Sequence, residues 1–326
     1  DLDHIVDIPL KEYLELPIYM RHYLTLFRAG RIEFPGATEP LWDPYVLGAW
    51  LGDGDSDRPE FTLGDAEIAR EIEDRSPGLV MARGATNHHR RGARYRLRLP
   101  PPTTPRQRVN PFMTVLREYD LLHNKHIPRD IKCGSVQTRL DVLAGLLDTG
   151  GHLHANCYEI TQKNQTLAVD FAFVARSLGF AAYVTKVQNT WAKPGGGDGV
   201  AGTHHKVSIS GSGLEDIPVV LDRNTASTRG QIEDALRTGF DVVPLGMGEY
   251  VGPALDGDHR YLLWDFTVTH NTLTALGIAL AFWNSKRRIV LATTVANEKD
   301  INLKKYAQIL FEFFPAEAKQ IFSGKP

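Results

Sequence analysis

The chain has 326 residues, of which 42% are hydrophobic and 23% are charged, and its formal net charge is −2. This length is sufficient for two or three domains with buried cores, and the near-zero charge excludes a chain that binds polyanions through its total charge. Two cysteines, Cys133 and Cys157, exclude a disulfide framework, and the lack of a membrane-length apolar run or a signal peptide favours a cytoplasmic protein.

The first 43 residues contain a short predicted helix, a basic segment over residues 21–31 and a linker at Phe34-Pro-Gly-Ala. No residue pattern in this stretch indicates chemistry. Because the chain starts at Asp1 rather than Met and ends at Pro326, we expect both ends to be cuts through a longer reading frame.

An internal repeat follows. Residues 46–54 read Val-Leu-Gly-Ala-Trp-Leu-Gly-Asp-Gly, and residues 143–151 read Leu-Ala-Gly-Leu-Leu-Asp-Thr-Gly-Gly. Each nonapeptide precedes a strand-like segment and then a helix-like one. The chain therefore contains two copies of one supersecondary unit.

Small residues occupy matching places in both nonapeptides. Gly48 and Gly52 lie four residues apart on one helix face, as do Gly145 and Thr149. Small side chains let two helix backbones approach closely, despite the low helix propensity of glycine. We therefore predict that the two helices pack together with their C-terminal ends adjacent.

The second nonapeptide resembles the motif of the LAGLIDADG (DOD-type) homing endonucleases, and the first resembles it more loosely. Lys125-His-Ile-Pro before the second copy and Ala175-Arg-Ser-Leu-Gly-Phe after it are also similar to that family. The resemblance implies an α+β domain over residues 44–239 with two αββαββα repeats. It implies a monomer that cleaves double-stranded DNA, with Mg²⁺ as cofactor, at a homing site in the host gene that lacks the insertion.

The family places an acidic residue from each copy at the eighth motif position, where the pair binds the metal ion. Asp53 occupies this position in the first copy and is the implied catalytic and metal-binding residue, whereas Gly150 occupies it in the second. Asp148 lies two positions earlier, roughly 200° around a helix, and should not substitute. We therefore predict DNA binding without efficient double-strand cleavage, with at most residual nicking of one strand.

A basic surface is predicted between the two nonapeptides. Residues 75–117 contain ten arginines and neither lysine nor an acidic residue. In a strand, Arg94, Arg96 and Arg98 would share one face, and their guanidinium groups suit DNA phosphates or guanine edges. A solvated strand face is the alternative, but a run without counter-charge favours DNA binding. The corresponding DNA-binding candidates in the second repeat are Lys186 and Lys206.

The stretch that ends this region resembles the C-terminal splice junction of an intein. In that family the last residue is Asn, with His before it and Cys, Ser or Thr after it, as in His270-Asn271-Thr272. An upstream Asp-His-x-aromatic motif is matched at His259. By the family's roles, the Asn271 amide attacks its own carbonyl without any cofactor. His270 and His259 assist the proton transfers, and Thr272 is the ligation nucleophile. A lone His-Asn-Thr would otherwise indicate a loop or a helix cap.

The intein resemblance implies an all-β (Hint) splicing domain into which the endonuclease is inserted. Residues 1–43 would be its remnant and linker, and residues 240–271 its C-terminal strands. Residues 272–326 would be a fragment of the host protein, the extein, joined in cis. Their predicted helix, strand and helix resemble an α/β P-loop ATPase of helicase or terminase type just after its phosphate loop, where Thr272 would bind the Mg²⁺ of the nucleotide.

Two alternatives stay open on these residues. One is an endonuclease fold that binds DNA but no longer cuts it, which Gly150 favours. The other is an ATPase with a large insertion that does not cleave itself. The upstream reading frame, or long incubation of the intact chain, would separate these alternatives from a self-cleaving element.

Overall fold

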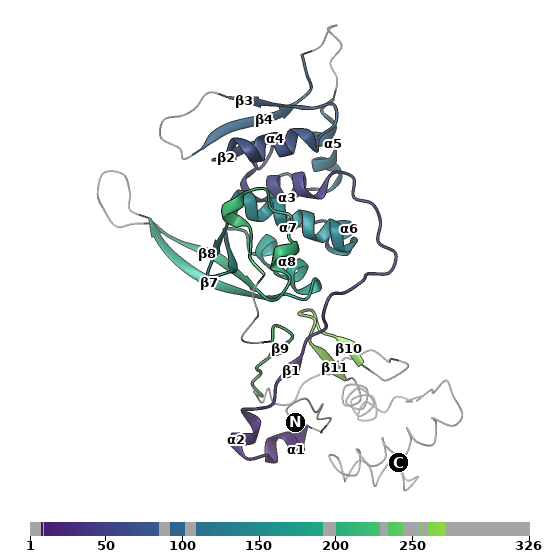
Figure 1. Cartoon of the computed structure of the whole chain (residues 1–326), viewed down its shortest axis with the longest axis vertical. Coiled ribbons are helices and arrows are strands. Elements are labelled where there is room, and N and C mark those ends of the chain that lie inside the picture. Colours follow the sequence, from purple (N-terminus) through teal and green to yellow (C-terminus); the bar gives the residue numbers. More distant parts are fainter. Residues whose placement is uncertain are drawn as a thin grey trace, which may run out of the picture. The chain divides into compact units, whose positions relative to one another are not determined.

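The computed structural model describes residues 8, 10–84, 92–101, 109–191, 200–228, 234–243, 255 and 260–270. The chain divides into two compact units, one formed by Phe27–Thr238 and the other by Asp1–Leu26 with Gly239–Pro326 (Figure 1). The described residues form a mixed α+β structure with several small antiparallel sheets, which confirms the predicted fold class at this level. Among them, no helix has both the length and the apolar character needed to cross a membrane.

The larger unit contains two successive sets of helices and strands. The first set is α3 (Pro44–Asp53), β2 (Glu60–Leu63), α4 (Ala66–Asp74), β3 (Val80–Arg83), β4 (Ala93–Arg98) and α5 (Pro111–Glu118). The second is α6 (Arg129–Lys132), α7 (Val136–Gly150), β5 (Gly151–His154), β6 (Cys157–Gln162), α8 (Gln165–Ser177), β7 (Ala181–Trp191) and β8 (Val200–Ser210), followed by the 3-10 turns η1 (Leu214–Asp216) and η2 (Asp222–Asn224). Side-chain caps at Asp43 and Ser135 start the two nonapeptide helices, α3 and α7.

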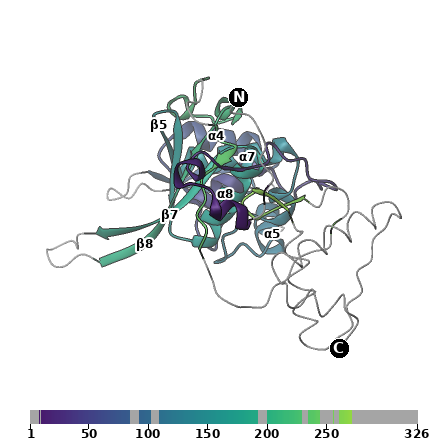
Figure 2. The ribbon, with the colours of Figure 1, turned by 90° about the horizontal axis from the view of Figure 1, so that it is seen from below.

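The two sets share one strand order. The sheet of the second set runs β5-β6-β8-β7. The sheet of the first set runs β2-β4-β3, and an isolated antiparallel bridge between Gly54 and Phe61 lies where β5 pairs with β6 in the second. If the bridge is counted as a first strand, both sheets run in the order first, second, fourth, third. The β7–β8 hairpin projects from the body of this unit (Figures 1 and 2).

α3 and α7 pack against each other through glycines. A Cβ added at Gly48 would lie 2.3 Å from the carbonyl oxygen of Val142, and one added at Gly145 would lie 2.1 Å from that of Tyr45. Val142 and Tyr45 occupy equivalent places in the two copies. The helices therefore run side by side in the same direction, related by a local two-fold axis.

The axis also brings the C-terminal ends of these helices together. A Cβ added at Gly52 would lie 2.2 Å from the Oγ1 atom of Thr149, its counterpart in the other copy. The residues that follow them, Asp53 and Gly150, end the two helices. The predicted close approach and the predicted adjacency of the helix ends are both confirmed.

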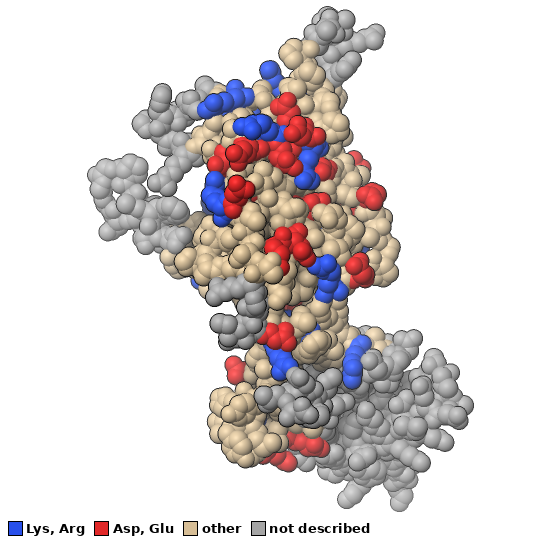
Figure 3. All heavy atoms as spheres, in the orientation of Figure 1, with Lys and Arg blue, Asp and Glu red and all other residues tan. Residues whose placement is uncertain are grey.

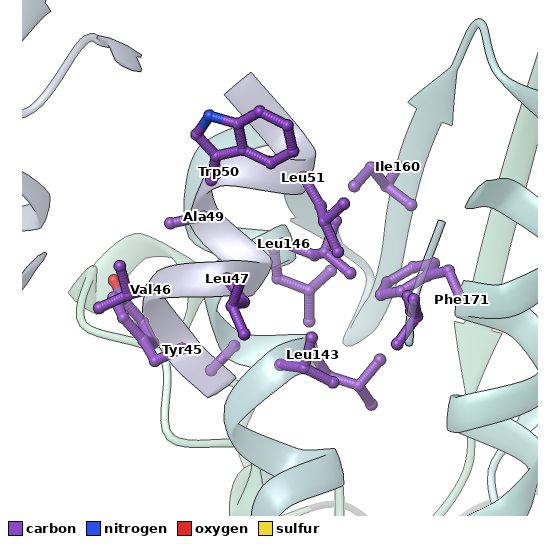
Figure 4. Close-up of a cluster of buried hydrophobic side chains, with 14 of the residues drawn as sticks. Tyr45, Val46, Leu47, Ala49, Trp50, Leu51, Leu143, Leu146, Ile160 and Phe171 are labelled. Carbon is purple, nitrogen blue, oxygen red and sulfur yellow. The ribbon is translucent and has the colours of Figure 1, made fainter. Parts of the chain in front are cut away.

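A hydrophobic core surrounds the helix pair. α3 is buried without interruption from Tyr45 to Leu51, because its residues are apolar on every face rather than on one stripe. Each large side chain that is fully buried contributes roughly 1.5–3 kcal/mol. Figure 4 labels ten of the buried side chains: Tyr45, Val46, Leu47, Ala49, Trp50, Leu51, Leu143, Leu146, Ile160 and Phe171.

Replacing Gly145 by Ala is expected to destabilise the protein, although alanine is the better helix former. The gain in helix propensity is about 1 kcal/mol, whereas overpacking a filled contact costs about 1–3 kcal/mol. The obstructing atom is the Tyr45 backbone oxygen at 2.1 Å, which cannot move unless α3 and α7 separate, so the cost should lie at the upper end. Urea unfolding measures the change. Gly64→Ala is the control, because nothing lies within 4 Å of a Cβ added there. Equal stability of Gly145→Ala and wild type would contradict this packing.

The predicted linker is part of the larger unit from Phe27 onward. The Ile32 N–H donates to the Ser177 carbonyl at 2.8 Å. The guanidinium of Arg139 is fully buried and donates to the carbonyls of Ile32 and Ser177, while the Phe34 ring lies 5.0 Å from its Cζ atom. These contacts hold residues 32–34 against the second repeat. The roles of the four predicted domains stay predictions.

The smaller unit contains short elements. They are α1 (Leu10–Glu15), α2 (Ile18–Arg21), β10 (Arg260–Leu262) and β11 (Val268–His270). The Tyr13 and Phe240 rings meet at 5.0 Å between centroids. β10 and β11 pair in antiparallel register. The larger unit also contains β9 (Arg237–Thr238), which forms a two-stranded sheet with β1 (Leu26–Phe27).

Candidate nucleic-acid interface and splice junction

Asp53 lies at the C-terminal end of α3, where the helix dipole is negative. Burial raises the pKa of its carboxyl group, and the nearby Lys125 opposes that shift. The Lys125 ammonium donates to the carbonyls of Trp50, Leu51 and Gly54 at 2.8, 3.2 and 2.7 Å. The protein thus provides its own cation at this helix end.

Lys125 is the site residue that sequence reasoning missed. It stacks 4.7 Å from the centre of the Trp50 ring, and burial lowers its pKa to about 8 against the opposing effect of Asp53 and Asp55. The only sequence signal was its position in Lys125-His-Ile-Pro. Its partner carbonyls lie more than 70 residues away in the chain, so no local pattern indicates the contact.

The equivalent position at the end of α7 is Gly150, which has no carboxylate. A Cβ added at Gly150 would lie 3.4 Å from Ile160 Cδ1, and the amide nitrogen of Gln162 would be the next group at 3.7 Å. These are ordinary van der Waals distances, and Gly150 is exposed, so a side chain that begins at this Cβ can extend toward solvent. The second repeat therefore lacks a metal-binding acid because residue 150 is glycine, and not because neighbouring atoms fill the position of its Cβ.

Asp148 is engaged elsewhere. Its carboxylate is buried and accepts hydrogen bonds from the Tyr45 hydroxyl at 3.0 Å and from the Val220 and Leu221 amides at 2.7 and 3.3 Å. Burial and the neighbouring Asp148 charge raise the pKa of Tyr45, so this hydroxyl stays protonated as a donor. Asp148 therefore anchors the segment after β8 and cannot replace the missing acid.

The residues present do not make a complete metal site. Asp53 offers one carboxylate, Gly150 offers none, and in the described part of the chain no three His, Cys, Asp or Glu residues are grouped as metal ligands. Divalent magnesium prefers several hard oxygen ligands in octahedral geometry. The paired acids implied by the family resemblance are thus reduced to one.

β4 is the central strand of the first sheet and carries the predicted arginine face. Arg94, Arg96 and Arg98 are exposed, whereas Tyr95 and Leu97 are buried. The alternation predicted for this strand is therefore present. Among the described residues, Arg98 makes no ion pair, whereas Arg94 and Arg96 both pair with Glu60.

Glu60 supplies the counter-charge that the arginine-rich run itself lacks. This residue lies opposite Arg96 in the β2–β4 ladder and is only 2% exposed. Its Oε1 atom accepts from Arg96 Nε at 2.6 Å and also from Arg96 Nη2, and its Oε2 atom lies 3.8 Å from Arg94 Nη1. The expectation of a face without counter-charge is thus corrected, because strand pairing brings in an acid from 36 residues upstream.

A small cleft connects this face to the end of α3. It has a volume of about 220 Å³ and is lined by residues that follow Asp53 and by residues of the sheet. On the face seen in Figure 3, basic and acidic side chains lie beside one another in this unit rather than in separate patches. The residues that line the cleft are Gly54, Asp55, Ser56, Glu60, Phe61, Thr62 and Arg94.

The two lysines of the second repeat lie on opposite faces of its sheet. Lys206 is paired with Thr185 on β7, and its ammonium lies 2.9 Å from Glu159 Oε1. Lys186 is paired with His205 and therefore shares the face of His205, whose neighbour Lys206 points the other way. One face of this sheet therefore cannot present both lysines to the same DNA segment.

The splice-junction candidates lie at the edge of the described residues. β10 and β11 pair Arg260 with His270 and Tyr261 with Thr269, so the backbone of His270 ends this ladder. His259, Asn271 and Thr272 lie outside the described residues, as does the whole predicted ATPase fragment over residues 272–326.

No family model matches the chain. The replicative DNA helicase DnaB of Mycobacterium intracellulare is 35% identical to it over 160 residues, which is 48% of this chain and 22% of the helicase. The match thus spans about a fifth of the length of this curated relative. A region of the chain is related to this replicative helicase. Because only 55 residues follow Asn271, more than half of the matched residues precede Thr272.

Proposed function

We propose that this chain is part of a self-cleaving intein that carries a DNA-binding homing endonuclease domain and is inserted in a replicative helicase. The observation that carries the proposal is the two-fold pair of glycine-packed helices, each leading into a sheet of the same strand order. Such a pair brings two half-sites together at one point. Two exposed sheets on either side of that point suit the two halves of a duplex DNA site.

The endonuclease part is proposed to bind DNA and not to cut both strands efficiently. Asp53 beside Lys125 forms one half-site, whereas Gly150 beside the neutral amide of Gln162 forms the other. The asymmetry favours binding alone, or nicking of a single strand, over double-strand cleavage. Exposed arginines on β4 would contact the DNA backbone and bases.

Two observations support the splicing part. In the β10–β11 ladder, Arg260 is paired with His270, and His259 and Asn271 are each one peptide bond away from this pair. In the chain, the proposed proton donor His259 directly precedes Arg260, and the proposed nucleophile Asn271 directly follows His270. The relationship to a helicase extends well upstream of Thr272, as expected if the relative contains a counterpart of the insertion.

Salt-dependent binding to duplex DNA tests the endonuclease part. Each lost phosphate contact should reduce the slope of log affinity against log salt by roughly 0.9. Arg98→Ala should cause this reduction, and replacing Arg94, Arg96 and Arg98 together should cause a larger one. Arg70→Ala is the control, since Arg70 is an exposed arginine on α4, whose buried residues join the core on the other side of the sheet. Fluorescence anisotropy with a labelled duplex measures the slope. An unchanged slope for the triple variant would mean that this face meets solvent rather than DNA.

A further inference from the structure

Glu60 is a buried carboxylate on the outward face of a sheet, which is an uncommon place for one. Removal of a carboxylate from water is costly unless charged partners compensate it. Glu60 is 2% exposed because the arginines of β4 cover it, while the side chains of Arg94 and Arg96 remain 51% and 57% exposed. The acid is thus hidden beneath groups that still face solvent.

The contacts with Glu60 fix one arginine more closely than the other. Both Nε and Nη2 of Arg96 donate to the same oxygen, Oε1. Arg94 approaches only the second oxygen, at 3.8 Å, which is too long for a hydrogen bond. Because a guanidinium is planar and rigid, two donors on one acceptor set the orientation of the whole Arg96 group.

Among the described residues, only Glu60 contacts this guanidinium by a hydrogen bond or ion pair, so one edge of the group carries no such contact. A guanidinium has five N–H donors, and Glu60 occupies only the side that carries Nε. The end formed by Nη1 and the outer N–H of Nη2 is turned away from the acid. A pair of N–H donors of this kind matches the O6 and N7 acceptors of guanine in the major groove.

We propose that Glu60 is a positioning residue that holds Arg96 to read a guanine in duplex DNA. The inference rests on the proposed DNA-binding function and adds base specificity to it. Arg98 is the contrast, because it makes no ion pair in the described part of the chain and is suited to a sequence-independent phosphate contact. The ion pair of Lys206 with Glu159 in the second repeat has no planar fork and should give no such base preference.

Selection from a library of random duplex DNA, with the full chain, tests the proposal. Wild type should enrich guanine at one position by about 5- to 150-fold over other bases, the range for one bidentate pair. Arg96→Lys keeps the charge but removes the fork and should lose this preference at that position alone. Glu60→Gln keeps the size of the side chain and should reduce the same preference. Glu159→Gln, the matched change in the second repeat, should leave it intact.

The outcomes separate this inference from the function on which it rests. If wild type shows salt-dependent binding but enriches no guanine, or if Arg96→Lys retains the preference, the inference fails and DNA binding stands. If Glu60→Gln retains the preference that Arg96→Lys loses, Glu60 does not position the arginine. If Glu60→Gln does not fold, Glu60→Asp takes its place, since it withdraws the carboxylate while keeping its charge. If wild type binds no duplex DNA, the proposed function fails as well.

Discussion

Asn271→Ala is expected to abolish release of a fragment that begins at Thr272, whereas the parent chain should release it slowly. The Asn side-chain amide is the proposed nucleophile, and alanine has no group that can close the five-membered succinimide ring. His259→Ala should slow the reaction by about 100-fold or more, the usual contribution of general acid–base catalysis. Intact mass spectrometry of the purified chains over time measures release.

Thr272→Ala is the matched control for this junction. Asn cyclisation does not use the Thr272 hydroxyl, so this variant should still release the C-terminal fragment of 55 residues. Equal release from the parent chain and from Asn271→Ala would refute the assignment of Asn271. A parent chain that stays intact through long incubation would instead favour an ATPase with an insertion that does not cleave itself.

Gly150→Asp is expected to convert a DNA-binding or nicking protein into one that cuts both strands. The substitution adds a carboxylate at the C-terminal end of α7, next to the end of α3 that carries Asp53, and a Cβ at this exposed position meets no atom closer than 3.4 Å. In the presence of Mg²⁺, a plasmid with the uninterrupted host gene should be linearised by Gly150→Asp and at most nicked by the parent chain. Agarose gel electrophoresis distinguishes the two products.

The controls separate charge from size. Gly150→Asn has nearly the same shape as Gly150→Asp but no charge, and it should not gain cleavage. Asp53→Asn should abolish any nicking by the parent chain. A second readout is independent of activity: the melting temperature of Gly150→Asp should rise with Mg²⁺ more than that of the parent chain, because a carboxylate at a helix C-terminus is stabilised by a bound cation. Robust linearisation by the parent chain would refute the idea that Gly150 disables it.

Sequence patterns predicted those features of the fold that depend only on residues close together in the chain. The two nonapeptides predicted a repeated unit, and glycines four residues apart predicted a close helix pair, because helical periodicity alone puts them on one face. The strict alternation at Arg94, Arg96 and Arg98 predicted an exposed face by the two-residue period of a strand. The missing acid at Gly150 could also be recognised by its position in the motif.

The pairing of distant segments decided the rest. Glu60 faces Arg96 only through the register of β2 and β4, and Lys125 reaches the end of α3 across more than 70 residues. Register also sends Lys186 and Lys206 to opposite faces, since one residue of offset reverses the direction of a side chain. The sequence by itself therefore determined which residues share a face within an element. Only the tertiary structure decided which charges meet, because contact energies between distant segments, not periodicity, select the register.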